Sequence, residues 1–152
     1  MDKKLQNKLF RKYPDFFQDR KQPTNVTRMY DGICCGDGWY NLIDEVCDKL
    51  DLFYNISGCE PIFFQIKEKF AGLRIYIDRI EDNEESGFTK KDQLLIDQII
   101  RLIISDAMNQ SYFICEECGE HRKDTKKLGS WYYAMCDKCW KKFLKKRTNK
   151  RK

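Results

Sequence analysis

Two pairs of cysteines near the C-terminus constrain this chain most strongly. Cys115 and Cys118 form one C-x-x-C pair, Cys136 and Cys139 form a second, and 17 residues separate the pairs. A tight turn places the two sulfurs of a pair about 3.5–4 Å apart, the edge of a tetrahedron whose metal–sulfur bonds measure about 2.3 Å. The spacing predicts one structural zinc ion (Zn2+) held by four thiolates. The alternative is a set of free or disulfide-bonded cysteines.

The residues around these cysteines predict a treble-clef or zinc-ribbon finger. An aromatic, strand-like run over residues 131–135 lies between the pairs, and residues 140–146 have a helical pattern after the second pair. We expect a finger over residues 112–146 that docks on the body, because no linker separates it from the preceding helix. Residues 147–152 are expected to form a basic, disordered tail.

Residues 1–111 are predicted to form an α+β body in which a small antiparallel hairpin packs on two main helices. Apolar residues at helical spacing predict one helix over residues 41–54, with Asp37 as its N-cap. A second helix is expected over residues 92–109, opened by a capping box at Thr89. Its apolar residues cover well over half of its circumference, which predicts a largely buried helix.

The hairpin is expected over residues 61–78, where apolar and polar residues alternate and Phe70-Ala71-Gly72 supplies the turn. This pattern gives it one apolar face. Its other face and the loop before the first main helix form a candidate surface for a host protein or a small anionic ligand. The residues of that surface are Asp37, Trp39, Lys67, Lys69, Arg74 and Tyr76. The alternatives are a cap for Asp37, a core or domain-packing role for Trp39, and a solvated sheet face.

Charge is distributed unevenly along the chain. Eight of the twelve residues from Lys141 to Lys152 are basic and none is acidic, which leaves 21 basic and 24 acidic residues in residues 1–140. Such a basic segment can contact phosphates, with Trp140 or Tyr132 stacking on bases, but basic tails also serve solubility. The residues predicted to contact nucleic acid are Trp140, Lys141, Lys142, Lys145, Lys146 and Arg147.

The sequence favours a binding protein over an enzyme. Four cysteines close the metal site and leave no open position for an activated water, and no zinc-deaminase, metalloprotease or phosphate-loop signature occurs. His121 is either an alternate metal ligand or an exposed side chain. The remaining cysteines are expected to be free thiols: Cys34, Cys35, Cys47 and Cys59.

The first residues contain no apolar core of a signal peptide, and no segment reads as a membrane span. We therefore expect a cytoplasmic protein without a membrane partner. In a reducing compartment, cysteines bind metal more often than they form disulfides.

Three segments resemble a family of small proteins encoded by bacteriophages and prophages. They are Cys35-Gly36-Asp37-Gly38-Trp39-Tyr40, the hairpin segment over residues 67–76, and Cys115-Glu116-Glu117-Cys118-Gly119. The family has a CGDGW segment, a KxKFGGLRFY hairpin and a C-terminal cysteine-pair finger; here Ala71 replaces a glycine and Ile75 a phenylalanine. The resemblance spans residues 31–139. It implies a fold and a phage context, in the host cytoplasm, in which an interaction protein can blunt a host defence.

Overall fold

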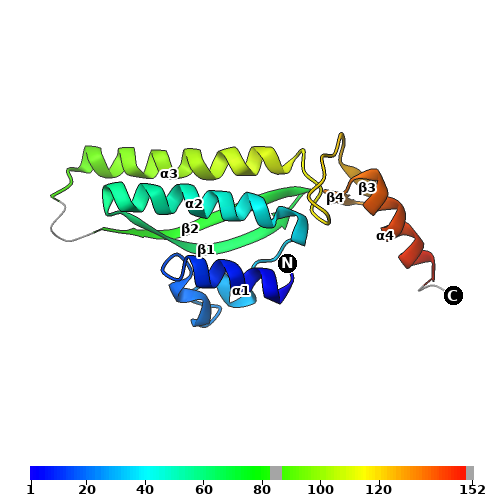
Figure 1. The fold of residues 1–152 in the computed structure, drawn as a ribbon, viewed down its shortest axis with the longest axis horizontal. Helices are drawn as coiled ribbons and strands as arrows, with labels where there is room; N and C mark the ends of the chain where they lie inside the picture. The colour runs from blue at the N-terminus through cyan, green and yellow to red at the C-terminus, as the bar shows by residue number, and fades with distance from the viewer. Residues whose placement is uncertain (83–86, 150–152) are drawn as a thin grey trace.

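The computed structural model describes residues 1–82 and 87–149 and shows an α+β body with a small finger at one end (Figure 1). The body contains α1 (Lys3–Lys12), α2 (Tyr40–Ser57), β1 (Glu60–Lys69), β2 (Gly72–Glu81) and α3 (Lys90–Ser111). Three short 3-10 helices also belong to it: η1 (Gln18–Lys21), η2 (Arg28–Asp31) and η3 (Asp37–Trp39). The finger contains β3 (Lys126–Leu128), β4 (Trp131–Tyr133) and α4 (Asp137–Asn149). The predicted fold class is confirmed.

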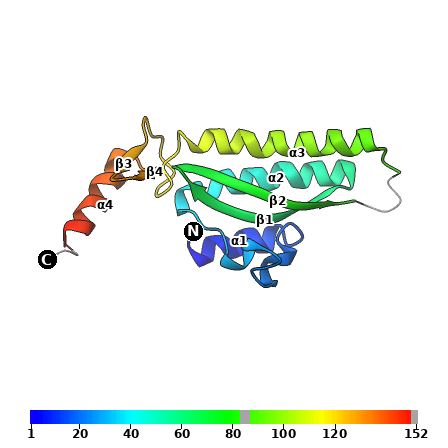
Figure 2. The ribbon, with the colours of Figure 1, turned by 180° about the vertical axis from the view of Figure 1, so that it is seen from behind.

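The β1–β2 hairpin forms the middle layer of the body. α2 and α3 lie side by side on one side of it, and α1 lies on the other (Figures 1 and 2). Ile62 and Phe63 are neighbours in β1, and both are buried. Both faces of the hairpin are therefore covered at the end where β1 begins and β2 ends. The ring of Phe63 lies 5.0 Å from that of Phe17, which follows α1 in the chain. The prediction of a hairpin with a single apolar face was therefore wrong at this end.

The register of the hairpin explains the error. The strands pair antiparallel from Glu60 opposite Glu81 to Lys69 opposite Gly72, with shifts of register on both sides of Phe63. A shift of this kind inserts an extra residue in one strand and reverses the side to which the following side chains point. As a result Phe63 is buried in place of Phe64, and the alternation read from the sequence fails there.

The capping box at the start of α3 is confirmed. The Thr89 backbone N–H donates to the Asp92 carboxylate at 2.9 Å, and the Asp92 N–H donates to the Thr89 hydroxyl at 3.3 Å. The helix is less buried than predicted, because only one stripe at helical spacing faces the core: Ile96, Ile100, Ile104 and Ala107. Three of its leucines lie mostly in solvent: Leu94, Leu95 and Leu102.

Asp37 does not cap α2, contrary to the prediction. It begins η3, which runs directly into α2, and its carboxylate instead accepts a hydrogen bond of 2.6 Å from the Asp2 backbone N–H. The residue at the N-cap position of α2 is Trp39, whose side chain makes no capping hydrogen bond. The Asp37 carboxylate therefore connects the start of the chain to the loop before α2.

The finger follows the predicted order of knuckle, hairpin, and helix beginning at the second cysteine pair. α4 extends through Asn149, so residues 147–149 are helical, and the prediction of a disordered tail from residue 147 was wrong for them. The rest of that predicted tail, residues 150–152, lies outside the described residues. None of the helices in the described part of the chain combines the length and apolarity needed to cross a bilayer.

Candidate metal centre and its attachment to the body

The four cysteines predicted to bind metal converge. The sulfur atoms of Cys115, Cys118, Cys136 and Cys139 all lie within 4.8 Å of one another. The Cys118 and Cys136 sulfurs are 3.7 Å apart, and the edge of a tetrahedron with four metal–sulfur bonds of 2.3 Å is about 3.8 Å. These cysteines are free thiols in the described chain. The cluster can therefore hold one metal ion in tetrahedral geometry.

Backbone hydrogen bonds shape both halves of the site. In the first knuckle the Gly119 N–H donates to the Cys115 carbonyl oxygen at 2.9 Å, and Gly119 adopts a left-handed conformation with φ 77°. That conformation costs little in glycine, which has no Cβ. In the second half the Trp140 N–H donates to the Cys136 carbonyl oxygen at 2.9 Å, and this bond begins α4. Each C-x-x-C pair is therefore closed by a turn of its own.

The pKa values of the two thiols in the second pair, Cys136 and Cys139, are shifted in opposite directions. A hydrogen bond from the Cys139 backbone N–H lowers the pKa of the Cys136 thiol to about 7, whereas burial raises the pKa of Cys139. Four thiolates at this separation repel one another unless a cation compensates their charge. Metal binding in such a site therefore releases protons, and its affinity falls as the pH is lowered.

The metal knuckle is held on the body by the segment before α2. The Gly38 N–H donates to the Glu116 carbonyl oxygen at 2.7 Å, and the Trp39 indole Nε1–H donates to the Ile114 carbonyl oxygen at 3.0 Å. A methyl carbon added at Gly38 would overlap the Cys115 carbonyl oxygen and would lie 2.8 Å from the Cys118 backbone nitrogen. The backbones of the two segments are thus in direct contact.

Glu116 adds a buried carboxylate to this interface. One carboxylate oxygen accepts a hydrogen bond of 2.8 Å from the Gly36 N–H, and the Glu116 backbone N–H donates to the Ala134 carbonyl oxygen at 2.7 Å. Burial raises the pKa of the Glu116 carboxyl to about 7, although the hydrogen bond from Gly36 opposes this shift. Side chain and backbone of one residue therefore join the body, the first knuckle and the segment before the second knuckle.

Arg122 is the second attachment and is almost fully buried. Its guanidinium donates to the Ala71 carbonyl oxygen at 2.8 Å, in the turn between β1 and β2, and to the Ser111 carbonyl oxygen at 3.3 Å, at the end of α3. Further hydrogen bonds reach the carbonyl oxygens of Ile114 and Asp124 and the Thr125 hydroxyl. Burial lowers the pKa of this guanidinium. Its hydrogen bonds are the compensation for removing the charge from water.

The six residues predicted to contact nucleic acid, one tryptophan and five basic residues, lie on two different sides of α4. Trp140 packs with Phe143 against Tyr133, with ring centroids 5.4 and 5.0 Å from that of Tyr133. Trp140 is therefore part of the finger's own small core, and this packing competes with the base-stacking role predicted for it. At 3.6 residues per turn, four exposed lysines share the arc away from this core: Lys141, Lys142, Lys145 and Lys146. Arg147 lies on the hairpin side, with its guanidinium over the Phe143 ring.

The second candidate surface does not form as predicted. Trp39 is fully buried, which confirms the domain-packing alternative and removes it from any exposed ligand site. Arg74 donates to the Tyr112 hydroxyl at 2.7 Å. The ammonium groups of Lys67 and Lys69 lie over aromatic rings, those of Tyr76 and Phe70 respectively. The four hairpin residues remain at least partly exposed, but Asp37 and Trp39 have other partners.

His121 and the four other cysteines have no place in the metal site. The ring of His121 is exposed and stacks on Phe113, and His121 is absent from the cluster of close ligand atoms in the described chain. Cys47 is fully buried, and burial raises its pKa, as it does for Cys35 and Cys59. Cys34 is exposed and pairs through its backbone with β1 at Ile66 and Glu68.

Sequence reasoning missed the residues that attach the finger. The one available signal was the pair of glycines flanking Asp37, since glycines allow a close approach of backbones, but no pattern in the sequence indicated which segment approaches them. Nothing local distinguishes Glu116 or Arg122 from the many other charged residues, because their burial depends on the docking itself.

A scan against protein-family models, a search of curated proteins and a search of solved structures each found no match to this chain. The resemblance to phage- and prophage-encoded proteins therefore stays a prediction.

Proposed function

We propose that this protein is a non-catalytic, zinc-containing binding protein that contacts nucleic acid through its finger. The single observation that carries the proposal is the exposed lysine arc of α4, a helix that begins at the second cysteine pair and extends away from the body (Figure 1). The resemblance described above favours a phage-infected cell as the setting.

Zinc is the metal that this donor set suits best. Four sulfur ligands in a tetrahedron are typical of structural Zn2+ sites, whereas Mg2+ and Ca2+ prefer oxygen ligands. With zinc bound, Cys115, Cys118, Cys136 and Cys139 would hold it with no position left for water. The ion would then contribute folding free energy to a region that has few aliphatic residues.

Metal analysis tests this assignment directly. Purified protein should contain one zinc ion per chain, and the single substitutions Cys115→Ser and Cys136→Ser should each lower that content strongly. Retention of stoichiometric zinc by both variants would refute the four-cysteine site. Cys34→Ser is the matched control, because Cys34 is exposed and outside the cluster.

The lysine arc suits a phosphate backbone. Lys141 and Lys145 lie one helical turn apart, as do Lys142 and Lys146, so that the cations follow the helix axis in two adjacent rows. Each lysine that neutralises a phosphate releases a condensed counterion, which makes binding strongly dependent on salt. Contacts of this kind position a protein on nucleic acid without reading its sequence.

Binding of labelled DNA and RNA across a salt series tests the arc. In a variant with Lys141→Gln, Lys142→Gln, Lys145→Gln and Lys146→Gln, the slope of log K against log salt should become shallower by about 3, at roughly one counterion per lost phosphate contact. Substitution is preferable to truncation after residue 140, because Phe143 belongs to the core of the finger.

The matched control removes the same charge elsewhere. Lys3, Lys4 and Lys8 near the start of the chain and Lys91 of α3 are all exposed. Their joint replacement by Gln should change the slope by less than about 1. If both sets of four substitutions changed the slope equally, the net charge of the protein, and not the position of the lysines on α4, would determine binding. No binding by the wild-type protein would overturn the nucleic-acid proposal and favour a host protein or a small anion as the partner.

A further inference from the structure

We propose that the groove between the hairpin turn of the body and the β3–β4 hairpin of the finger binds unpaired bases. The protein would then prefer single-stranded nucleic acid. The inference rests on the proposed function, because it requires that the finger contacts nucleic acid, and it adds the substrate class. The groove is lined by Glu68, Lys69, Phe70, Ser130, Trp131 and Tyr132 and has a volume of about 490 Å³.

Three aromatic rings in this groove are exposed. The exposed fraction is 70% for Phe70, 74% for Trp131 and 45% for Tyr132. The chain has two other tryptophans. Trp39 is buried, and Trp140 packs in the core of the finger. Large aromatic side chains exposed together on a surface mark a binding site more often than isolated ones do.

Cations lie beside the same rings. The Lys69 ammonium lies 5.4 Å from the centroid of the Phe70 ring, and the Lys127 ammonium lies 5.3 Å from that of Tyr132. The one carboxylate of the groove, Glu68, accepts a hydrogen bond from the Ala71 N–H, which holds it in the turn. The groove therefore combines aromatic faces with positive charge.

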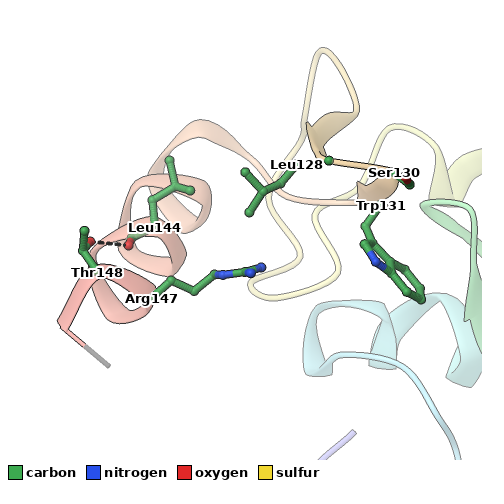
Figure 3. A pocket seen from close by; sticks show the side chains of 7 residues that line it. Leu128, Ser130, Trp131, Leu144, Arg147 and Thr148 are labelled. Carbon is green, nitrogen blue, oxygen red and sulfur yellow. Dashed lines mark hydrogen bonds between the residues drawn. The ribbon is translucent and has the colours of Figure 1, made fainter. Parts of the chain in front are cut away.

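Trp131 also borders a second groove, of about 610 Å³, between the finger hairpin and α4. Leu128 and Leu144 line its two walls, and the Arg147 side chain reaches across from α4 (Figure 3). In the same view the Trp131 ring points away from α4. The two grooves meet at Trp131, so a strand that stacks a base there has cations on either side for its neighbouring phosphates.

The backbone of Phe70 provides independent support. Phe70 and Ala71 form the two-residue turn of the hairpin with φ values of 55° and 58°, a left-handed conformation that favours glycine or asparagine. A bulky residue pays about 1–2 kcal/mol there. Ala71 is buried and hydrogen-bonded to Arg122, but the Phe70 side chain is mostly exposed, so packing offsets little of this cost. Strain without a packing benefit is characteristic of functional positions.

Single strands are the form of nucleic acid that such a surface selects. In a duplex the faces of the bases are stacked on one another and hidden from side chains. Unpaired bases can stack on aromatic rings, and because every base has a π-face the contact tolerates any sequence. A positively charged path beside stacking rings is the usual design of proteins that bind single strands.

Substitution of Trp131 tests the proposal. The probes are labelled oligothymidylate, oligouridylate and a DNA duplex of equal charge. Trp131→Ala should weaken binding of the single strands about tenfold or more, within the range measured for loss of one stacking contact, and leave duplex binding within about twofold of wild type. The DNA and RNA strands distinguish which source of unpaired bases the groove accepts. Tyr30→Ala is the matched control, because Tyr30 is an exposed aromatic residue on η2 in the body.

The outcomes separate this inference from the proposed function. If Trp131→Ala binds single strands as tightly as wild type while the four-lysine variant does not, the groove is refuted and the lysine arc stands. If the four-lysine variant binds every probe as wild type does, the proposed function fails first. Zinc content and thermal unfolding of Trp131→Ala must match wild type, and Phe70→Ser, tested in parallel, should show the same selective loss.

Discussion

At the scale of single residues, the two glycines of the CGDGW segment are the contact points between body and finger. Gly36 has an ordinary φ of −73°, so it is required for space and not for conformation. A methyl carbon there would lie 2.7 Å from Glu116 Cγ, and at Gly38 it would overlap backbone atoms of the first knuckle. Backbone atoms within a metal knuckle cannot move aside without disturbing the ligands.

Gly38→Ala should therefore destabilise the protein by about 2 kcal/mol or more, as overpacking of a rigid contact does. Urea denaturation followed by far-UV circular dichroism measures this loss. Gly87→Ala is the matched control. Among the described residues, a methyl group at Gly87 meets no atom within 4 Å, so only the cost of its left-handed conformation, about 1 kcal/mol, is expected. A variant at Gly38 as stable as wild type would show that the finger does not dock in this way.

The convergence of the four cysteines was predictable, because two C-x-x-C pairs at this spacing constrain one another within the sequence itself. The burial of Trp39 was weighed correctly as one of two alternatives, since a tryptophan beside glycines fits either a core or a ligand site. Arg122 was not predictable. Its five acceptors come from the hairpin turn, the end of α3 and its own loop, and only the docked fold brings them together.

At the scale of elements, α3 shows how far hydrophobic periodicity can be trusted. Ile100 is buried and Leu102 is exposed, although both are aliphatic and lie two positions apart on one helix. The apolar residues, which cover well over half of its circumference, predicted a largely buried helix. Among the described elements, α2 and β2 are the main neighbours of α3, so a helix with apolar residues on most of its circumference cannot bury all of them. The number of available neighbours is a property of the fold and not of the helix.

Alanine substitutions on α3 should separate these two faces. Ile100→Ala is expected to cost about 3 kcal/mol of unfolding free energy, because it leaves a cavity in the core. Leu102→Ala should change stability by no more than about 0.5 kcal/mol. Thermal or chemical denaturation of both variants provides the measurement. Comparable losses at the two positions would mean that the Leu102 face is covered, for example by a second molecule.

The hairpin illustrates a different limit. Its existence and its turn were predictable from alternation and from Phe70-Ala71-Gly72. Its register was not, because a shift near Phe63 depends on contacts with Phe17 across the layer below. Such long-range contacts leave no periodic trace in the sequence.

At the scale of the whole molecule, the four-cysteine cluster and the body form one structural unit. The first knuckle contacts the loop before α2, and Arg122 contacts the hairpin turn, so two separate attachments join the finger to the body. The fully buried Trp39 indole lies at the first of them. Loss of a bound metal should therefore change the structure of the body at this interface as well as that of the finger.

Chelation tests this coupling. In a protein with Trp131→Phe and Trp140→Phe, Trp39 is the sole tryptophan and reports on the interface. Removal of zinc should shift its fluorescence to longer wavelength as water reaches the indole, and restored zinc should reverse the shift. Emission that stays constant while zinc is lost would show that docking persists without the ion.

If Phe70 contacts unpaired bases as proposed, its left-handed backbone conformation lowers stability at a position that binding requires. Asparagine tolerates this conformation, so Phe70→Asn should raise the free energy of unfolding by about 1 kcal/mol. The same change should lower the affinity for unpaired bases, because it removes an aromatic ring. Melting temperature and oligonucleotide affinity, measured on the same variant, should move in opposite directions; a fall in both would contradict the idea. A lineage freed from the need to bind would be expected to lose this phenylalanine early, because drift toward asparagine or glycine improves folding. If the proposal holds, the identity of residue 70 in related chains would indicate which of them bind unpaired bases at this groove.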